Sequence, residues 1–276
     1  MKWSRKTSDG IAYHYNASNS VDEKAIPIVF IHGVGLRAES WEQQLAVFGD
    51  QYRCFAIDMP GHGDSELLDK PTLTLDDFAE ALKNFINNVI GEPAIVVGHS
   101  LGAMTALQTA VTYPEVIRGV AALNAIFDRA DSAAQKVQSR AESLLDNLEQ
   151  NVSDQPIARW FDKDSKYQVQ AQMCRDWLDN GNRLGYARAY RMFAYLSGIS
   201  AAQLQTIIAP TLLLTGELDA NSSPEMSLAM ANIVPDARAV IVPKARHMTQ
   251  MTHASEVNSA LKLFFEQCTT HGNIDA

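Results

Sequence analysis

The sequence GHSLG at residues 98–102 has the G-x-S-x-G spacing of a serine held at a sharp turn between a strand and a helix. An apolar run at residues 94–97 precedes the motif, and an alanine- and leucine-rich segment at residues 101–113 follows it. Glycines on both sides let the backbone pass closely at the turn, so that the serine hydroxyl is exposed at the helix N-terminus. We therefore predict Ser100 as a nucleophile, in preference to a serine that only caps a helix.

A nucleophilic serine needs a general base, because its hydroxyl is otherwise a very weak acid. The chain has seven histidines. His247 follows the apolar run at residues 239–242, on a loop before the last predicted helix, and such a loop emerges at the same edge of a parallel sheet as Ser100. We predict His247 as the base, with His253, at a helix start, as the competing candidate.

An acidic residue must hold the imidazole in the right tautomer and stabilise its cation. Asp219 follows the apolar run at residues 211–215 and gives the order Ser, Asp, His that the serine motif predicts. Glu217 is the runner-up for this role. The other position at which such an acid is sometimes found follows the run that ends at Leu123, where the sequence offers Asn124. We therefore predict Asp219.

The oxyanion that forms during attack on a carbonyl needs two hydrogen-bond donors fixed in advance. The backbone N–H of Leu101, at the predicted helix start, is one candidate. The loop HGVG at residues 32–35 follows another apolar run and supplies the second, for which we predict the N–H of Val34. Its two glycines give this loop its conformational freedom.

The elements that must position these groups alternate along the chain. Apolar runs without polar alternation suit strands that are buried on both faces of a sheet. Amphipathic or apolar helical patterns separate them, which favours a mostly parallel, doubly wound α/β sheet, opened by an antiparallel hairpin around Asp9-Gly10. The predicted strands are residues 28–31, 54–57, 94–97, 119–123, 211–215 and 239–242, and the predicted helices are residues 75–89, 101–113, 224–233 and 255–265.

The stretch from residue 128 to residue 205 breaks this rhythm, because it has helical patterns and no strong strand signal. The predicted helices are residues 139–148, 167–178 and 183–196. We predict a helical cap at residues 128–205, inserted between strands of an α/β core formed by residues 1–127 and 206–276. An insertion after a strand lies at the carboxyl edge of the sheet, where ligands bind. It is therefore placed to cover a pocket.

The composition of the chain argues against several classes of partner. The chain of 276 residues has a formal net charge of −9 and no run rich in Lys or Arg, whereas nucleic-acid binding needs basic patches. Cys54, Cys174 and Cys268 are far apart and lack C-x-x-C spacing, so we expect free, buried thiols and not a disulfide framework or a zinc site. With no signal-peptide pattern and no apolar stretch that spans a bilayer, we expect a cytoplasmic protein with neither a membrane nor a nucleic-acid partner.

The motifs fall in a familiar order: FIHGVG at residues 30–35, DMPGHGDS at 58–65, GHSLG at 98–102, GELD at 216–219 and RHM at 246–248. In this order the chain resembles the α/β-hydrolase superfamily, in particular its capped esterases and lactonase-like members. The resemblance implies the α/β-hydrolase fold, a Ser-His-Asp catalytic triad, and a structural loop at residues 58–65. Relatives with an aspartate nucleophile, such as haloalkane dehalogenases and epoxide hydrolases, are disfavoured by Ser100.

We therefore expect a serine hydrolase that cleaves a small-to-medium carboxylic ester, lactone or thioester with water, without a cofactor or a metal, as a monomer or homodimer. A carbon–carbon bond hydrolase of the same fold, a ligand-binding receptor with slow hydrolysis and a partner-binding scaffold stay open as alternatives. Aromatic and arginine side chains of the cap could line the pocket or meet a substrate carboxylate, or else pack the cap and face solvent. They are Trp160, Phe161, Trp177, Tyr190, Phe193 and Tyr195, and Arg159, Arg175, Arg188 and Arg191.

Overall fold

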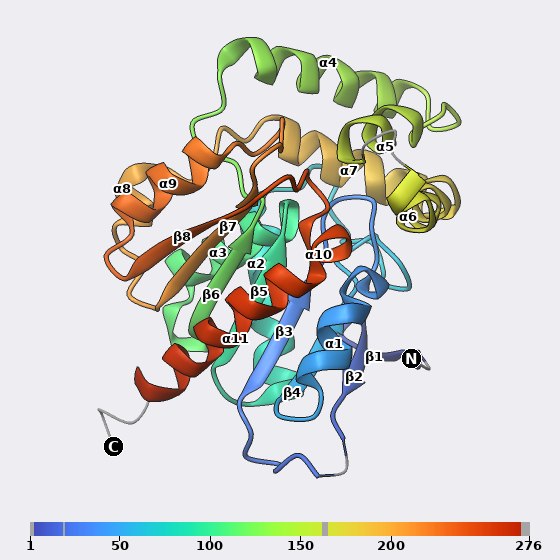
Figure 1. Cartoon of the computed structure of the whole chain (residues 1–276). Coiled ribbons are helices and arrows are strands. Elements are labelled where there is room, and N and C mark those ends of the chain that lie inside the picture. The colour runs from blue at the N-terminus through green and yellow to red at the C-terminus, as the bar shows by residue number, and fades with distance from the viewer. Residues whose placement is uncertain (1–2, 19, 162–164, 272–276) are drawn as a thin grey trace.

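The computed structural model describes residues 3–18, 20–161 and 165–271, and in these residues eight strands form one sheet (Figure 1). Their order across the sheet is β1-β2-β4-β3-β5-β6-β7-β8. Every strand run that the sequence predicts is present. The strands are β1 (Lys6–Ser8), β2 (Ile11–Asn16), β3 (Pro27–Ile31), β4 (Arg53–Ile57), β5 (Ala94–His99), β6 (Ile117–Leu123), β7 (Thr211–Gly216) and β8 (Ala237–Val242).

The sheet is mostly parallel, as predicted. β1 and β2 form the opening antiparallel hairpin, and β2 pairs antiparallel with β4. The turn of the hairpin has Asp9 and Gly10 at φ 49° and 75°, a conformation that glycine adopts at little cost. From β4 to β8 every neighbouring pair is parallel. The carboxyl ends of these strands therefore meet at one edge, from which the candidate site residues emerge.

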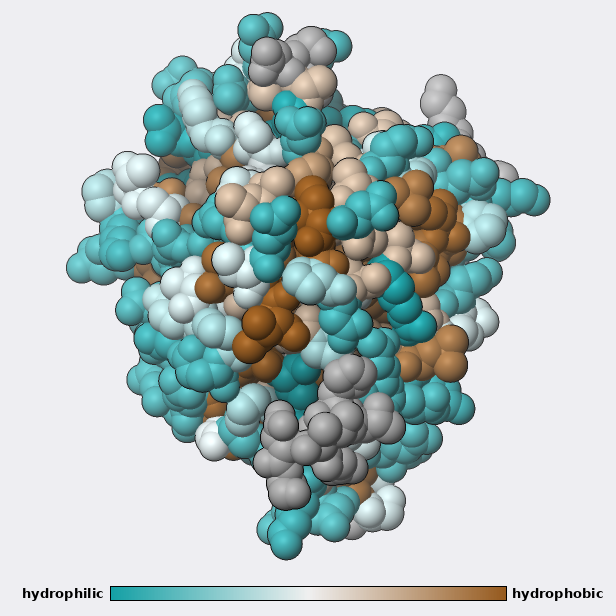
Figure 2. All heavy atoms as spheres, turned by 90° about the vertical axis from the view of Figure 1, so that its left-hand side faces the viewer, coloured by the Kyte–Doolittle hydropathy of each residue, from teal (hydrophilic) through white to brown (hydrophobic). Residues whose placement is uncertain are grey.

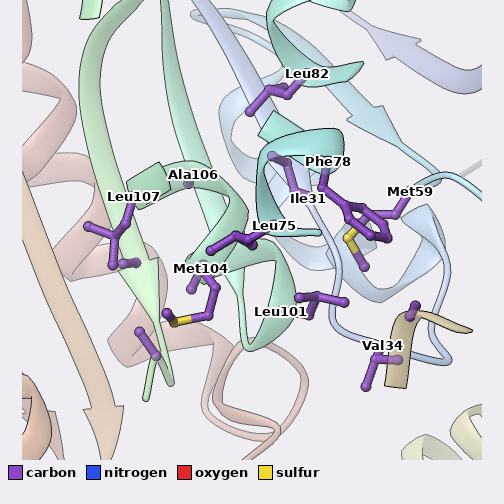
Figure 3. Close-up of a cluster of buried hydrophobic side chains, with 14 of the residues drawn as sticks. Ile31, Val34, Met59, Leu75, Phe78, Leu82, Leu101, Met104, Ala106 and Leu107 are labelled. Atoms are coloured by element: carbon purple, nitrogen blue, oxygen red, sulfur yellow. The ribbon is translucent and has the colours of Figure 1, made fainter. Parts of the chain in front are cut away.

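Helices cover both faces of the sheet, in front and behind in Figure 1. The helix α3 (Leu101–Thr112) is buried on nearly all sides, because every residue from Leu101 to Ala110 is buried. Figure 3 shows side chains of α2 and α3 gathered in one cluster with Ile31 and Met59. One face carries α2 (Leu75–Phe85), α3 (Leu101–Thr112) and α9 (Pro224–Ile233), and the other carries α1 (Glu42–Phe48) and α11 (Ala254–His271).

The cores of the two faces are separate. Successive residues of β3 and β5 point to opposite faces of the sheet. Val29 and Val96 therefore contribute to one core, and Phe30 and Val97 contribute to the other. This alternation explains why the strands read as continuous apolar runs. The helix α1 was not predicted from the sequence, because its apolar residues are few and widely spaced.

Helices alone connect β6 to β7 in the described part of residues 124–210. Most of them, α4 to α7, lie together beyond the carboxyl ends of the strands, at the top of Figure 1, whereas α8 packs beside α9 on one face of the sheet. The three predicted helical segments are covered by α4, α6 and α7, whereas the short α5 and α8 were not predicted. Their bounds are α4 (Asp131–Asp146), α5 (Asp154–Trp160), α6 (Gln168–Asn180), α7 (Arg183–Ala194) and α8 (Ala201–Leu204).

The three cysteines are free and buried, as the sequence predicts. Within the described residues, no helix has the length and apolar character needed to cross a membrane. Figure 2 shows the face that carries α8 and α9, where hydrophobic residues form separate groups among hydrophilic ones. That face therefore gives no support to the partner-binding scaffold.

Candidate active site

Ser100 lies at the turn between β5 and α3, in a backbone conformation that is rare for a residue with a side chain. Its φ is 54° and its ψ is −114°, and its side chain makes no capping hydrogen bond to the helix. The two motif glycines permit the turn. A Cβ placed on Gly98 would lie 2.1 Å from the carbonyl oxygen of Gly102, and a Cβ on Gly102 would lie 2.4 Å from that of Ile31. Strain of this kind concentrates at functional sites, and the serine does not act as an ordinary helix cap.

The loop after β3 lies beside this turn. A Cβ placed on Gly33 would lie 3.2 Å from Ser100 Cβ, and Gly35 has a φ of 76°. Among the described residues, the backbone N–H groups of Val34 and Leu101 donate to no protein acceptor. An unpaired N–H is expected at the first residue of a helix, which is the position of Leu101. The two donors predicted for an oxyanion are thus both available to a ligand.

His247 and Asp219 are bonded to each other at the same edge of the sheet, on the loops that follow β8 and β7. His247 Nδ1 lies 2.8 Å from Asp219 Oδ2, and both side chains are buried. Because a carboxylate accepts, Nδ1 carries a proton and donates it, which leaves Nε2 as the basic nitrogen. Burial opposes ionisation of Asp219, but His247 and the other donors to the carboxylate outweigh it and lower its pKa.

Asn124 helps to hold this carboxylate, and the sequence analysis assigned it no role. Its Nδ2 donates to Asp219 Oδ2 at 2.8 Å, and its Oδ1 accepts from Thr249 Oγ1 at 2.7 Å. It is fully buried, with a φ of 55°. The backbone N–H groups of Asn221 and Ser222 donate to the other oxygen, Oδ1, at 2.8 and 3.3 Å. Asp219 is therefore fixed by donors from several loops.

His99 connects the serine turn to the loop of His247. Its Nε2–H donates to the backbone carbonyl oxygen of His247 at 2.8 Å, and the two rings are 4.9 Å apart. Burial and the neighbouring His247 lower the pKa of His99 to about 3, so its imidazole is neutral. Within the described residues the Ser100 hydroxyl itself forms no hydrogen bond with His247. The link between the two residues runs through their neighbour, His99.

Comparisons with known proteins show the family of the chain. A family model described as "Alpha/beta hydrolase family" matches residues 28–260, which is most of the chain. This protein belongs to the alpha/beta hydrolase family. It is 34% identical over 241 residues to the (E)-2-((N-methylformamido)methylene)succinate hydrolase of Acinetobacter baylyi, covering 87% of this chain and 90% of that relative. It is 26% identical over 235 residues to the 2-(acetamidomethylene)succinate hydrolase of Mesorhizobium japonicum, covering 80% of this chain and 81% of that relative.

Solved structures of the same fold include the enol-lactonase of Burkholderia xenovorans. It superposes with a TM-score of 0.83 at 21% identity, covering 95% of this chain and 100% of that one. An esterase from Thermogutta terrifontis superposes with a TM-score of 0.82 at 21% identity, covering 97% of this chain and 98% of that one. The fold class predicted from the sequence is confirmed, and the chain is a hydrolase of this family.

The residues that competed for a catalytic role have other contacts in this hydrolase. Glu217 is exposed, and its carboxylate accepts the backbone N–H of Lys244 at 2.8 Å. His253 bonds Thr252 through Nδ1 at 2.9 Å, and its ring lies 5.9 Å from that of Tyr167. Among the described residues, neither Glu217 nor His253 forms a hydrogen bond with His247 or Asp219.

The helical insertion of the hydrolase reaches the site. The Trp160 ring stacks on the His247 ring, with 6.0 Å between centroids and 28° between planes. A cavity of about 290 Å³ lies between the insertion and the core, lined on one side by Trp177 and Tyr186 and on the other by Gly35 and His62. The loop at residues 58–65, expected near the pocket mouth, thus contributes to this cavity.

The arginines singled out in the sequence differ in their surroundings. Arg175 forms an ion pair with Asp154, and Arg191 forms one with Glu142 at 3.1 Å. The positive charges of these two arginines are therefore neutralised by ion pairs on the surface of the hydrolase. In the part of the chain that the structure describes, no three histidine, cysteine or acidic side chains converge as they would around a metal ion.

The neutral state of His99 predicts how the stability of the hydrolase depends on pH. An unfolded histidine has a pKa of about 6.5, so below that pH the unfolded chain binds a proton that folded His99 does not take up until about pH 3. We expect stability to fall as the pH falls from about 6.5 towards 3, by about 1.4 kcal/mol per pH unit for this residue alone. His32 and His62, whose pKa values burial also lowers, contribute in the same direction.

Urea denaturation at several pH values checks this expectation. The variant His99→Gln keeps a donor for the His247 carbonyl but has no titrating ring. Its free energy of unfolding should fall less steeply with decreasing pH than that of the wild type. The difference should be about 1.4 kcal/mol per pH unit between about pH 6.5 and pH 3. Equal slopes for the two proteins would show that His99 does not account for the loss.

Proposed function

We propose that this protein is a serine hydrolase that cleaves a small carboxylic acyl bond through a covalent acyl-enzyme on Ser100. The observation that carries the proposal is the buried hydrogen bond between His247 and Asp219, linked by His99 to the strained turn of Ser100. Hydrogen bonds of a nucleophile to its base are often long in an unliganded enzyme and shorten when the substrate binds. The missing bond between Ser100 and His247 is compatible with this role.

In the proposed reaction, His247 Nε2 removes the proton from Ser100 Oγ as this oxygen attacks the acyl carbon. The N–H groups of Val34 and Leu101 bind the negatively charged oxygen of the tetrahedral intermediate. The intermediate collapses when the bond to the leaving group breaks, and His247 gives its proton to that group. Water then attacks the acyl-enzyme with help from the same base, which releases the acid and restores Ser100.

Asp219 would remain ionised throughout and stabilise the imidazolium form of His247. The lowered pKa of Asp219 supports this role, because a carboxylate held by its donors resists protonation. Asn124 would act with it as a positioning residue, since it donates to the same carboxylate oxygen that accepts from His247.

Residues 128–205 would act as the cap over this site. The stacking of Trp160 on His247 supports the assignment, because it places a residue of the insertion directly on the proposed base. Exclusion of water by such a cap would strengthen the hydrogen bonds to the developing charge.

The scissile bond that we propose first is that of a small ester, lactone or thioester. A second candidate is the acyl bond to nitrogen, and the 34% identity to the (E)-2-((N-methylformamido)methylene)succinate hydrolase favours it. The same catalytic groups serve both bonds, because His247 can protonate either an alkoxide or an amine as it leaves. Substrate comparisons within one assay distinguish the two.

Labelling with a fluorophosphonate tests the proposal. Attack by Ser100 Oγ forms an oxygen–phosphorus bond and expels fluoride, so the intact mass should rise by one phosphonyl group. Peptide mapping should place that group on Ser100, and 4-nitrophenyl butyrate should be turned over many times per chain. A label on another residue would refute the nucleophile, whereas a single equivalent of nitrophenol without turnover would favour the ligand-binding receptor.

A further inference from the structure

Arg129 is a buried cation that has no acidic partner among the residues that the structure describes. It lies just after β6, where the chain enters the insertion, and only 8% of the residue is exposed. No carboxylate pairs with it among the described residues, and burial lowers the pKa of its guanidinium. Burying an unpaired charge is unfavourable, so such a group calls for an explanation.

The contacts of Arg129 satisfy only part of its guanidinium. Nη1 donates to the carbonyl oxygens of Phe193 and Ala194, at 3.4 and 3.2 Å, where α7 ends. The guanidinium carbon lies 4.7 Å from the centre of the Phe193 ring. In the described part of the chain, Nε and Nη2 have no protein acceptor. These atoms are therefore free to bind a ligand.

Arg140 is a second arginine of the insertion that pairs with no carboxylate in the part of the chain that the structure describes. Its Nη2 donates to the carbonyl oxygen of Val152 at 2.8 Å, and its Nη1 donates to the side chain of Gln155. Its Nε is buried without a partner among the described residues. This contrasts with Arg175 and Arg191, which also belong to the insertion and do have acidic partners.

Aromatic side chains of α7 lie next to both arginines. The guanidinium carbon of Arg140 lies 5.6 Å from the centre of the Tyr190 ring. Phe193, whose ring faces Arg129, follows Tyr190 by three residues and so lies on the same side of α7. The ring of Tyr186 lies 5.7 Å from that of Tyr190. Both tyrosines are almost wholly buried. The two guanidinium groups thus lie over neighbouring rings on one side of α7.

Tyr186 connects this cluster to the proposed oxyanion loop. A Cβ placed on Gly35 would lie 2.8 Å from Tyr186 Cε2, so the ring packs directly against the backbone next to Val34. Burial raises the pKa of Tyr186 to about 12, with Arg140 opposing the shift, so its phenol stays protonated and can donate a hydrogen bond. The aromatic side chains of α7 therefore extend from the proposed oxyanion loop, at Tyr186, to the guanidinium groups of Arg129 and Arg140.

We propose that Arg129 and Arg140, together with the Tyr186 hydroxyl, bind a carboxylate of the substrate, so that the hydrolase acts on small acids that carry this group a few bonds from the scissile carbonyl. A carboxylate accepts the planar donors of arginine well, and a bound anion would supply the missing counter-charge. This inference rests on the proposed function, because it places the carboxylate relative to Ser100.

Two 4-nitrophenyl esters of similar size test the site. The hydrogen succinate ester ends in a carboxylate, and the butyrate ester ends in a methyl group. We expect the wild type to have a kcat/KM for the succinate ester at least about tenfold above that for butyrate, after subtraction of spontaneous hydrolysis. Arg129→Met and Arg140→Met should each lose about tenfold or more on the succinate ester, mainly through KM, and change butyrate hydrolysis by less than about threefold.

Arg188→Met is the matched control, because Arg188 belongs to α7 but lies in a different surface pocket. It should leave both esters unchanged. Arg140→Lys and Tyr186→Phe keep most of the packing and should show smaller losses that are again confined to the succinate ester. Equal losses on both esters in the arginine variants, or no preference for the succinate ester in the wild type, would overturn the inference and assign these arginines to the packing of the insertion.

Binding of free succinate separates this inference from the proposed function. Succinate should raise the melting temperature of the wild type and compete with butyrate, and it should do neither with Arg140→Met. The thermal shift can be read even if neither ester is turned over, an outcome that would refute the proposed function alone. Turnover of butyrate without any effect of succinate would refute the carboxylate site alone.

Discussion

Replacing Ser100 with alanine is expected to reduce the kcat for 4-nitrophenyl butyrate at least about 10⁴-fold. The alanine lacks the oxygen that forms the acyl-enzyme, while the oxyanion donors and the pocket remain. Alanine at a φ of 54° has the same backbone strain as serine, so the fold should persist. Initial rates at saturating substrate, together with circular dichroism and the melting temperature, measure both effects.

Ser259→Ala is the control for this variant, because Ser259 lies on the exposed side of α11 and bonds only to its own helix. It should hydrolyse butyrate at the wild-type rate. A folded Ser100→Ala protein that keeps a tenth or more of the activity would show that another group attacks the ester.

Replacing His247 with alanine is expected to be nearly as damaging, with a loss of about 10⁴-fold or more in kcat, because the Ser100 hydroxyl then has no base. The variant also leaves Asp219 buried without the imidazole that stabilises its charge, so we expect some loss of stability as well. Progress curves at several enzyme concentrations measure the residual rate, and thermal unfolding shows how much protein is folded.

His253→Ala provides the matched control, since it removes a histidine that is only partly buried and lies near the same loop. Its activity should stay within about twofold of the wild type, because surface changes away from a site have small effects. The reverse pattern, with loss on changing His253 and retention on changing His247, would move the base to the competing position.

The fold and the candidate site differ in how far the sequence could predict them. The strands were predictable because a strand buried on both faces, such as Ala94–His99, shows as an uninterrupted apolar run. Ser100, Asp219 and His247 were predictable because each follows such a run at the strand end. Their catalytic roles remain predictions until the variants are made.

The supporting residues could not be predicted in this way, because their roles depend on contacts between distant segments. Asn124 was noted only as the absence of an acid, and its bonds to Asp219 and Thr249 join three loops of the fold. Arg129 and Arg140 stand out only because they have no acidic partner among the described residues, which no local sequence pattern reveals. The short helix α5 was missed because it has too few residues for an apolar period to emerge.

The stacking of Trp160 on His247 has a consequence for the timing of catalysis. The insertion cannot lift away from the core at this point without separating the indole from the imidazole. If His247 is the base, as we propose, separation of the two rings would expose this imidazole to bulk water, whereas the stacked indole shields it. We therefore expect any movement that lifts Trp160 off His247 to slow the proposed hydrolysis.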